Sequence, residues 1–201
     1  LGYPERLIKP LSMPGEPVGY LKDEIASEVG GNPLVVLCPT HDTASAVEAI
    51  DMEENAPYIS SGTWSLFGTE LANPIVNDKA FQINVTNEGG YGESTGFLKN
   101  IIGLWLIQEC RRDWLKSGID ISWDGVVNEA RKAEPLRSII NPDSPEFYAG
   151  GNMEQKIKDF CRKTNQPVPE TKGEVIRCIA ESLAFKYRKT VEDMEDATGN
   201  T

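Results

Sequence analysis

A short apolar run that ends in a polar turn and then opens into a helix is the feature that most constrains this chain. Residues 34–38 (LVVLC) have the composition of a buried strand, and the small residues at 43–50 predict a helix. Between them lie Thr40, His41 and Asp42. Reactive side chains in α/β folds lie where a strand gives way to a helix, so this segment predicts an α/β fold with a site at the turn.

The residues at this turn narrow the possible chemistry. His41 is the only histidine of the chain, which excludes chemistry that needs two. Asp42 at the end of a strand can accept a proton from a substrate hydroxyl, and in phosphoryl transfer such a base mainly orients the nucleophile. The alternative is that Asp42 caps the following helix. Neither a Gly-x-Ser-x-Gly elbow nor a Walker motif is present, so a serine hydrolase and a P-loop enzyme are both disfavoured.

The rest of the pattern places strands before helices. Alternation predicts two strands, 58–60 and 64–69, joined as a hairpin by Ser61-Gly62-Thr63, and another strand over 81–87. Helical periodicity and end signals predict helices over 22–29, 97–115, 123–133, 153–164 and 172–197. Elements this short fit one layered α/β structure.

Two polar groups within these elements are candidate binding sites. The glycine at the hairpin tip exposes backbone N–H groups and hydroxyls, a plausible phosphate cradle, although an ordinary turn is the alternative. Lys99, Asn100 and Gln108 lie on the helix predicted at 97–115, where Asn100 and Gln108 would stand about 12 Å apart along the axis. They either line a cleft or face solvent.

Composition limits the partners. The 201 residues are 39% apolar and 25% charged, and no run approaches the ~18 apolar residues of a membrane span. With no visible export signal, we expect a cytoplasmic protein without a membrane partner. The net charge of −11 argues against nucleic acid but not against a nucleotide, whose phosphates Mg²⁺ and amides can neutralise.

The four cysteines show no zinc-type spacing, and we expect no resident metal. Cys161 and Cys178 lie on two predicted helices joined by a proline-containing loop, where they could face each other. Two reduced thiols are the simpler interpretation for a cytoplasmic protein.

Four phrases carry a resemblance to a known family: HDTASAV (41–47), YISSGTWSLFGTE (58–70), NVTNEGG (84–90) and GFLKNIIGLWLIQECRR (96–112). In this order they resemble the FGGY carbohydrate kinases, and their wording is most similar to members that phosphorylate L-rhamnulose. The resemblance runs from about Pro33 to Arg112 and continues more faintly to about residue 190. Kinases of L-fuculose share the SSGTW hairpin, so these or another ketose kinase of the family are the alternative.

The resemblance implies an α/β fold of the actin-like (ribonuclease H-like) ATPase type, with two domains that hold ATP and a sugar in the cleft between them. It implies that ATP, with Mg²⁺, phosphorylates L-rhamnulose to L-rhamnulose 1-phosphate in L-rhamnose catabolism. Asp42 matches the catalytic base of the family, which also contacts the sugar.

The resemblance also assigns roles to other positions. His41, Thr43 and Asn100 match substrate contacts. Gly62, Thr63 and Gln108 match nucleotide contacts. Cys161 and Cys178 match a pair that some of these kinases bridge by a disulfide.

Two parts of the family pattern have no counterpart here: an amino-terminal glycine-rich phosphate loop that contains an aspartate, and a late Gly-Gly-Gly adenosine motif. We therefore expect a fragment, in which residues 1–54 are the tail of the amino-terminal kinase domain and carry Asp42. Residues 55–201 would then be the first part of the carboxy-terminal domain. Such a piece alone is expected to bind ATP poorly and to turn over no sugar.

A non-catalytic binding module that kept the fold and lost the chemistry is the alternative of a different class. The presence of Asp42 argues against it. The sequence leaves the exact ketose and the oligomeric state open.

Overall fold

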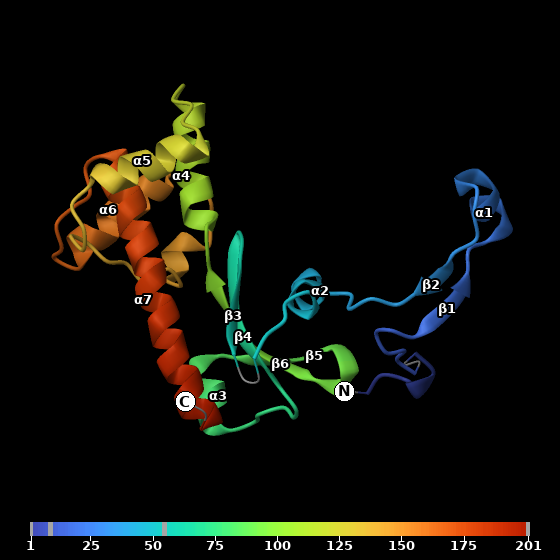
Figure 1. Ribbon diagram of the computed structural model, residues 1–201. Coiled ribbons are helices and arrows are strands. Elements are labelled where there is room, and N and C mark those ends of the chain that lie inside the picture. Colours follow the sequence, from blue (N-terminus) through green and yellow to red (C-terminus); the bar gives the residue numbers. More distant parts are fainter. Residues whose placement is uncertain (1, 8–9, 54–55, 200–201) are drawn as a thin grey trace.

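The computed structural model describes residues 2–7, 10–53 and 56–199. The domain boundary predicted between residues 54 and 55 lies outside the described residues. Figure 1 shows a helical part, a sheet, and an amino-terminal segment that stands apart from both. The predicted mixture of strands followed by helices is confirmed in outline, with two errors that are described below.

The amino-terminal segment is a two-stranded antiparallel ribbon. It begins with the short 3₁₀ helix η1 (Glu5–Leu7), and its strands are β1 (Pro17–Tyr20) and β2 (Leu34–Val36). Helix α1 (Asp23–Val29) connects the strands and ends at Gly30, which adopts a left-handed φ of 75°. The helix predicted at 22–29 is confirmed. The strand predicted at 34–38 is confirmed over Leu34–Val36 only, and its three residues are exposed rather than buried.

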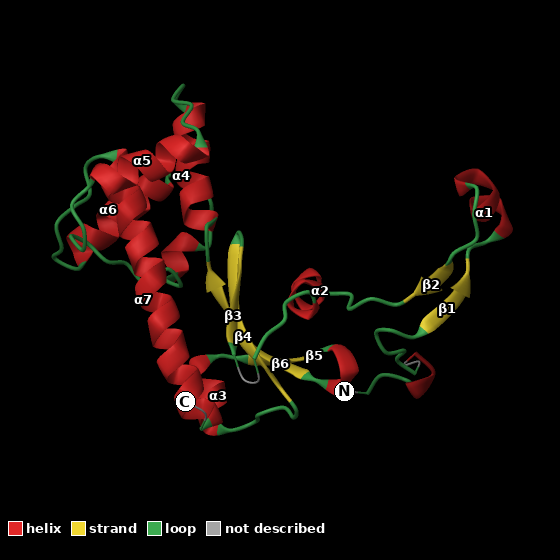
Figure 2. Ribbon diagram, in the orientation of Figure 1, coloured by secondary structure: helices red, strands yellow, loops and turns green. Residues whose placement is uncertain are grey.

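The second sheet is antiparallel, with four strands in the order β3-β4-β6-β5. Strands β3 (Pro57–Ser61) and β4 (Trp64–Leu71) form the predicted hairpin. Strand β6 (Thr95–Ile102) lies between β4 and β5 (Thr86–Gly89), and the short 3₁₀ helix η2 (Tyr91–Glu93) joins β5 to β6. Figure 2 shows this sheet with the long helix α7 (Lys172–Thr198) on one side and α2 (Asp42–Glu48) on the other.

The helix predicted over 97–115 is wrong in its first half. Residues 95–102 form the central strand β6, and only Trp105–Lys116 form a helix, α4. The apolar pairs Phe97–Leu98 and Ile101–Ile102 repeat every four residues, as in a helix, but all four side chains are buried because both faces of the strand are covered at these positions. A buried strand does not show the simple alternation that sequence analysis relies on.

The strand predicted over 81–87 is also wrong in part. Helix α3 (Asp78–Ile83) occupies its first half, and only Thr86–Gly89 form the strand β5. The Asn77 side chain caps α3 by accepting the Ala80 N–H at 2.7 Å, and Asn84 ends the helix with a left-handed φ of 56°. An asparagine lies at each end of this helix. The alternation of apolar and polar residues at 81–87 favoured a strand and hid this helix signal.

The remaining helices form the core with one face of the sheet. They are α4, α5 (Trp123–Lys132), the 3₁₀ helix η3 (Pro145–Phe147), α6 (Met153–Lys163) and α7. The predicted helices at 123–133, 153–164 and 172–197 are confirmed. Helix α7 begins with a capping box in which the side chains of Thr171 and Glu174 each accept the other's backbone N–H. Fully buried side chains tie the layers together: Phe97, Ile101, Leu106, Phe147, Ile157, Val175 and Ile179.

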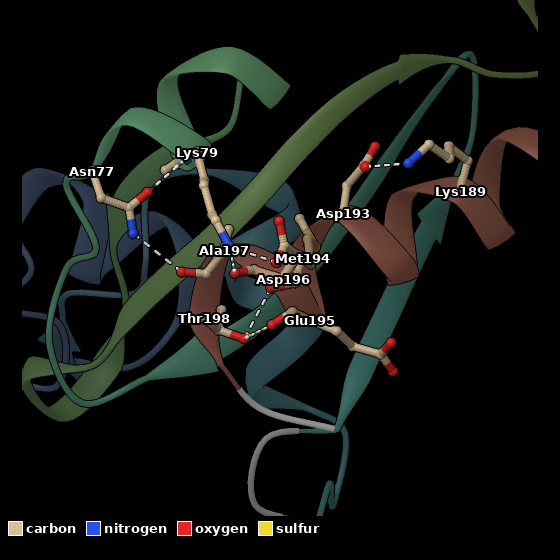
Figure 3. Close-up of polar contacts among 10 residues, drawn as sticks. Asn77, Lys79, Lys189, Asp193, Met194, Glu195, Asp196, Ala197 and Thr198 are labelled. Carbon is tan, nitrogen blue, oxygen red and sulfur yellow. Dashed lines mark hydrogen bonds and ion pairs between the residues drawn. The ribbon is translucent and has the colours of Figure 1, made fainter.

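The carboxy-terminal turn of α7 is fastened to α3 on the far side of the core (Figure 3). Asn77 Nδ2 donates to the Ala197 carbonyl at 3.1 Å, and Lys79 Nζ donates to the Asp196 carbonyl at 3.2 Å and to its carboxylate at 2.5 Å. These donors satisfy carbonyls that a helix end leaves unpaired. In the described part of the chain, no helix combines the length and the apolar character that crossing a membrane would require.

Candidate active site

A hollow of about 590 Å³ lies between the start of α2 and the hairpin β3–β4. We call it the α2–sheet hollow. Its described lining residues come from the start of α2, the hairpin and the strand β6: His41, Asp42, Thr43, Ser60, Ser61, Gly62, Thr63, Trp64, Leu66 and Asn100. Six residues predicted for the site therefore meet in one place, although they come from three separate parts of the sequence.

Asp42 is the first residue of α2 and is presented openly to the hollow. His41 precedes the helix in an extended conformation, and no side-chain cap bond is made from that position. The Asp42 carboxylate accepts the Thr43 N–H at 2.8 Å, and its side chain is 99% exposed. A carboxylate has about four lone-pair sites. The single bond to the helix start therefore leaves capacity to accept a proton, and the capping and base interpretations are compatible.

The two neighbours of Asp42 differ in burial. Thr43 is buried, whereas the His41 side chain is half exposed, with Nδ1 at 3.8 Å from Asp42 Oδ1. That distance exceeds a hydrogen bond. The histidine thus lies beside the carboxylate without fixing its orientation.

The hairpin tip is anchored to the start of α4. The Gly62 carbonyl accepts the Leu104 N–H at 2.9 Å, and the Thr63 carbonyl accepts the N–H groups of Gly103 and Trp105, both at 3.1 Å. Leu104 has no side chain that could cap α4, so the tip carbonyls replace the cap. The position of the tip is therefore set by backbone bonds.

The same geometry refines the predicted phosphate cradle. The Gly62 N–H donates to the Trp64 carbonyl at 2.8 Å within the turn, so it is already used. The Thr63 hydroxyl donates to Gln108 Oε1 on α4 at 3.2 Å. Thr63 and Gln108, predicted together as nucleotide contacts, are brought into direct contact.

Asn100 reaches the hollow from a strand and not from a helix. It lies on β6 directly opposite Leu66 of β4, with an exposed side chain. The predicted separation of Asn100 and Gln108 along one helix is therefore wrong, because Gly103 separates a strand from a helix. An ideal Cβ at Gly103 would lie 2.5 Å from Ser65 Oγ and 2.8 Å from the Gly62 carbonyl, so only glycine fits.

Lys99, predicted in the same group as Asn100, belongs to the opposite face of the sheet. Its ammonium donates to the Ile83 carbonyl. Burial, together with the nearby charge of Lys186, lowers the pKa of Lys99. Lys186 itself pairs with Asp143 at 2.7 Å, and Asp143 accepts the Ile102 N–H at 3.0 Å. The ion pair of Lys186 and Asp143 thus holds the end of β6 through the Ile102 N–H.

The sheet is fixed from behind by α7. Ser65 is fully buried and its hydroxyl lies 2.6 Å from the Tyr187 hydroxyl, while the Tyr187 ring stacks on Phe67 at 6.4 Å between centroids. Because side chains alternate along a strand, burial of Ser65 and Phe67 commits Trp64 and Leu66 to the hollow. The sequence prediction did not assign a role to these two lining residues, because alternation along β4 does not tell which of its faces is open.

Cys161 and Cys178 are not part of the hollow. They are buried on α6 and α7, and both are free thiols. Burial raises the pKa of both, that of Cys178 to about 12. Their bridging stays a prediction.

Comparison with known proteins gives matches along most of the chain. The model of the FGGY family of carbohydrate kinases, C-terminal domain, matches residues 57–201. A rhamnulokinase of Bacteroides thetaiotaomicron is 44% identical over 183 residues, which cover 90% of this chain and 37% of that protein. A rhamnulokinase of Halalkalibacterium halodurans is 41% identical and is matched over 98% of this chain and 41% of its own length. The chain thus spans about two fifths of the length of these curated relatives.

Solved structures confirm the fold. A xylulose kinase from Rhodospirillum rubrum superposes with a TM-score of 0.62 at 14% identity, covering 95% of this chain and 38% of that one. The kinase from Brucella ovis, described as a xyloylose kinase, gives 0.65 at 14% identity, covering 98% of this chain and 40% of that one. The predicted α/β fold of the actin-like sugar-kinase type is confirmed.

Proposed function

The chain belongs to the FGGY family of carbohydrate kinases, and from this premise we propose that the protein containing it is an ATP-dependent L-rhamnulose kinase. The reaction transfers the γ-phosphoryl group of ATP to the 1-hydroxyl of the ketose and gives ADP and L-rhamnulose 1-phosphate. The identity of 38–44% to several rhamnulokinases supports this choice of sugar.

The meeting of Asp42 with the Gly62–Thr63 tip in one hollow carries the proposal. The hollow of about 590 Å³ has the size of ordinary small-molecule sites, which run from about 300 to 1,000 Å³. A carboxylate on one wall and a turn fixed by backbone bonds on the other suit the positioning that phosphoryl transfer requires.

Asp42 accepts the proton of the attacking 1-hydroxyl while the new O–P bond forms and the bond to ADP breaks. The transition state of phosphoryl transfer is loose, so the base chiefly orients the nucleophile. High exposure of the Asp42 side chain suits this role, because it leaves the carboxylate accessible to the substrate hydroxyl. His41, Thr43 and Asn100 contact the sugar from the same hollow.

Thr63 and Gln108 hold the nucleotide. The Thr63 hydroxyl now donates to Gln108 Oε1. If the amide rotates by half a turn, Nε2 donates to Thr63 and the hydroxyl hydrogen becomes available to a phosphate oxygen. Gln108 thus controls whether Thr63 is a donor to the nucleotide.

Magnesium fits this donor set as an ion that enters with ATP. Within the described residues, no group of three or more histidine, cysteine, aspartate or glutamate side chains is suited to hold a metal. Mg²⁺ in kinases takes most ligands from phosphates and water, and Asp42 and the hydroxyls of the hollow are the oxygen donors it prefers. When bound, it neutralises charge on the phosphates.

Two wider features complete the proposal. Residues 1–54 are the end of an amino-terminal kinase domain and 55–201 belong to the carboxy-terminal domain, so that Asp42 lies beside the junction. The reaction takes place in the cytoplasm, where ATP is available.

The test is Asp42→Asn in the full-length kinase. We expect turnover on L-rhamnulose to fall at least ~10²-fold, about 3 kcal/mol of barrier, while KM for the sugar changes less than about threefold. The control is Glu48→Gln, which removes one charge from the exposed side of the same helix and should leave turnover within about twofold. A coupled ADP assay that finds near-normal turnover for Asp42→Asn removes this carboxylate from the mechanism.

A further inference from the structure

The floor of the α2–sheet hollow combines polar and apolar side chains in a fixed order. Ser60 of β3, Leu66 of β4 and Asn100 of β6 lie directly opposite one another in neighbouring strands. Trp64 lies two residues along β4 from Leu66, on the same face. All four line the hollow, so an apolar strip runs between polar groups.

Trp64 and Leu66 are the apolar side chains of that floor. The packing of β4 against α7 directs them into the hollow. Ser65 and Phe67, which alternate with them, are buried against α7. The Trp64 side chain nevertheless stays 51% exposed. A large exposed indole that lines the same hollow as the Asp42 carboxylate gains hydrophobic and dispersion energy when a ligand covers it.

Trp64 also lines a second hollow, as Thr63 does. The second hollow, of about 250 Å³, is lined by Thr63, Trp64, Ile102, Trp105 and Tyr148. This second hollow supplies a control residue, Trp105, which does not line the first.

We infer that Trp64 and Leu66 form an apolar wall that contacts the methyl group of a 6-deoxyketose and so determine specificity for it. The inference rests on the proposed function. L-Rhamnulose is 6-deoxy-L-fructose: its hydroxyls can bond to the polar groups of the hollow, whereas its C6 methyl has no hydrogen bond to make and needs an apolar partner. In L-fructose a hydroxyl replaces one hydrogen of that methyl and would lose its water against this wall.

The test compares L-rhamnulose with L-fructose in the full-length kinase. A hydrophobic pocket rejects an analogue that adds one hydroxyl by roughly 10²-fold, so we expect wild-type kcat/KM to favour L-rhamnulose by about 10- to 100-fold. Trp64→Ala should lower this preference at least about fivefold. Trp64→Phe keeps an apolar wall and should retain most of the preference. Trp105→Phe should change both sugars alike.

Leu66→Thr is the second variant, because it adds a polar group at a partly buried position and preserves strand propensity. We expect it to shift the preference toward L-fructose by about threefold, whether or not Trp64→Ala folds. Equal losses for the two sugars in Trp64→Ala and an unchanged preference in Leu66→Thr would overturn the inference. Failure of the wild-type kinase on L-rhamnulose is a separate readout that overturns the proposed function itself.

Discussion

Two regions of the molecule contain similar apolar residues but use them differently. In the arm, which we define as residues 2–7 and 10–38, no described residue is buried. In the packed unit, residues 56–199, the sheet and α4 to α7 enclose a continuous core. Figure 1 shows the arm standing away from that unit. The difference lies in what covers the residues and not in their type.

The strands of the arm form without a buried core, so they depend on secondary-structure propensity alone. Its ribbon is rich in β-branched and aromatic residues that favour strands, yet its large apolar side chains are exposed: Val18, Tyr20, Val29, Leu34, Val35 and Val36. An isolated two-stranded ribbon is at best marginally stable in water. We therefore expect nearly all the stability of this chain to reside in the packed unit.

Thiol reactivity should separate the two regions most strongly. Cys38 of the arm is exposed, whereas Cys110, Cys161 and Cys178 of the packed unit are buried. Burial raises the pKa of these three thiols, which suppresses the reactive thiolate. After reduction, titration of the 201-residue chain with Ellman's reagent should show one thiol reacting at least ~10³-fold faster than three others.

Cys38→Ser is the control for that titration, because it should remove the fast phase and leave the slow one. Addition of denaturant should merge the phases in the unaltered chain. Two or more fast thiols in the native chain would mean that the helical core opens as readily as the arm.

Glycine substitution gives the next largest contrast. At Gly103 an added Cβ would lie 2.5 Å from Ser65 Oγ and 2.8 Å from two backbone atoms that cannot move aside. At Gly31 of the arm it would meet nothing within 4 Å. We expect Gly103→Ala to lower the free energy of unfolding by about 3 kcal/mol, and Gly31→Ala to change it by less than about 0.5 kcal/mol. Urea unfolding followed by circular dichroism measures both.

A small decrease in the free energy of unfolding of Gly103→Ala would show that the hairpin tip can shift away from α4. The same variant in the full-length kinase then becomes informative, since that tip carries Thr63. Turnover should fall with stability if the tip is rigid, and stay normal if it adapts.

The sequence predicted local elements well where one signal dominated. The apolar run at residues 34–36 and the capped helix α7 are examples. It failed at β6, because apolar pairs at 97–98 and 101–102 have helical spacing although the strand is covered on both faces at these positions. Burial on two faces depends on the whole fold. The spacing of apolar residues along a short segment does not reveal it.

For the site, the order of motifs indicated which residues belong together but not how they meet. Asp42 and Thr63 were predicted from position, and the structure places them on opposite walls of one hollow. Trp64 and Leu66 became visible only with the strand register and the burial of Ser65. Which face of β4 is open depends on α7, more than a hundred residues away in the sequence.

The smallest expected effect concerns the carboxy-terminal end of α7, where an exposed ion pair joins two elements of the packed unit. Lys79 joins α3 to this end through Asp196, and both side chains are more than half exposed. Exposed ion pairs contribute little, so Lys79→Met should lower the free energy of unfolding by about 0.5 kcal/mol, and the loss should shrink in 1 M salt because exposed charges are screened.

Hydrogen exchange tells whether the contact between Lys79 and Asp196 stabilises the packing of α3 against α7. Lys189 is the matched control: it also pairs with an aspartate at 2.5 Å, Asp193, but within α7 itself (Figure 3). Lys79→Met should speed exchange of α3 amides, because α3 loses a connection to α7, while Lys189→Met should leave α3 unchanged. If the two variants affect α3 alike, the contact between α3 and α7 rests on Asn77 and core packing.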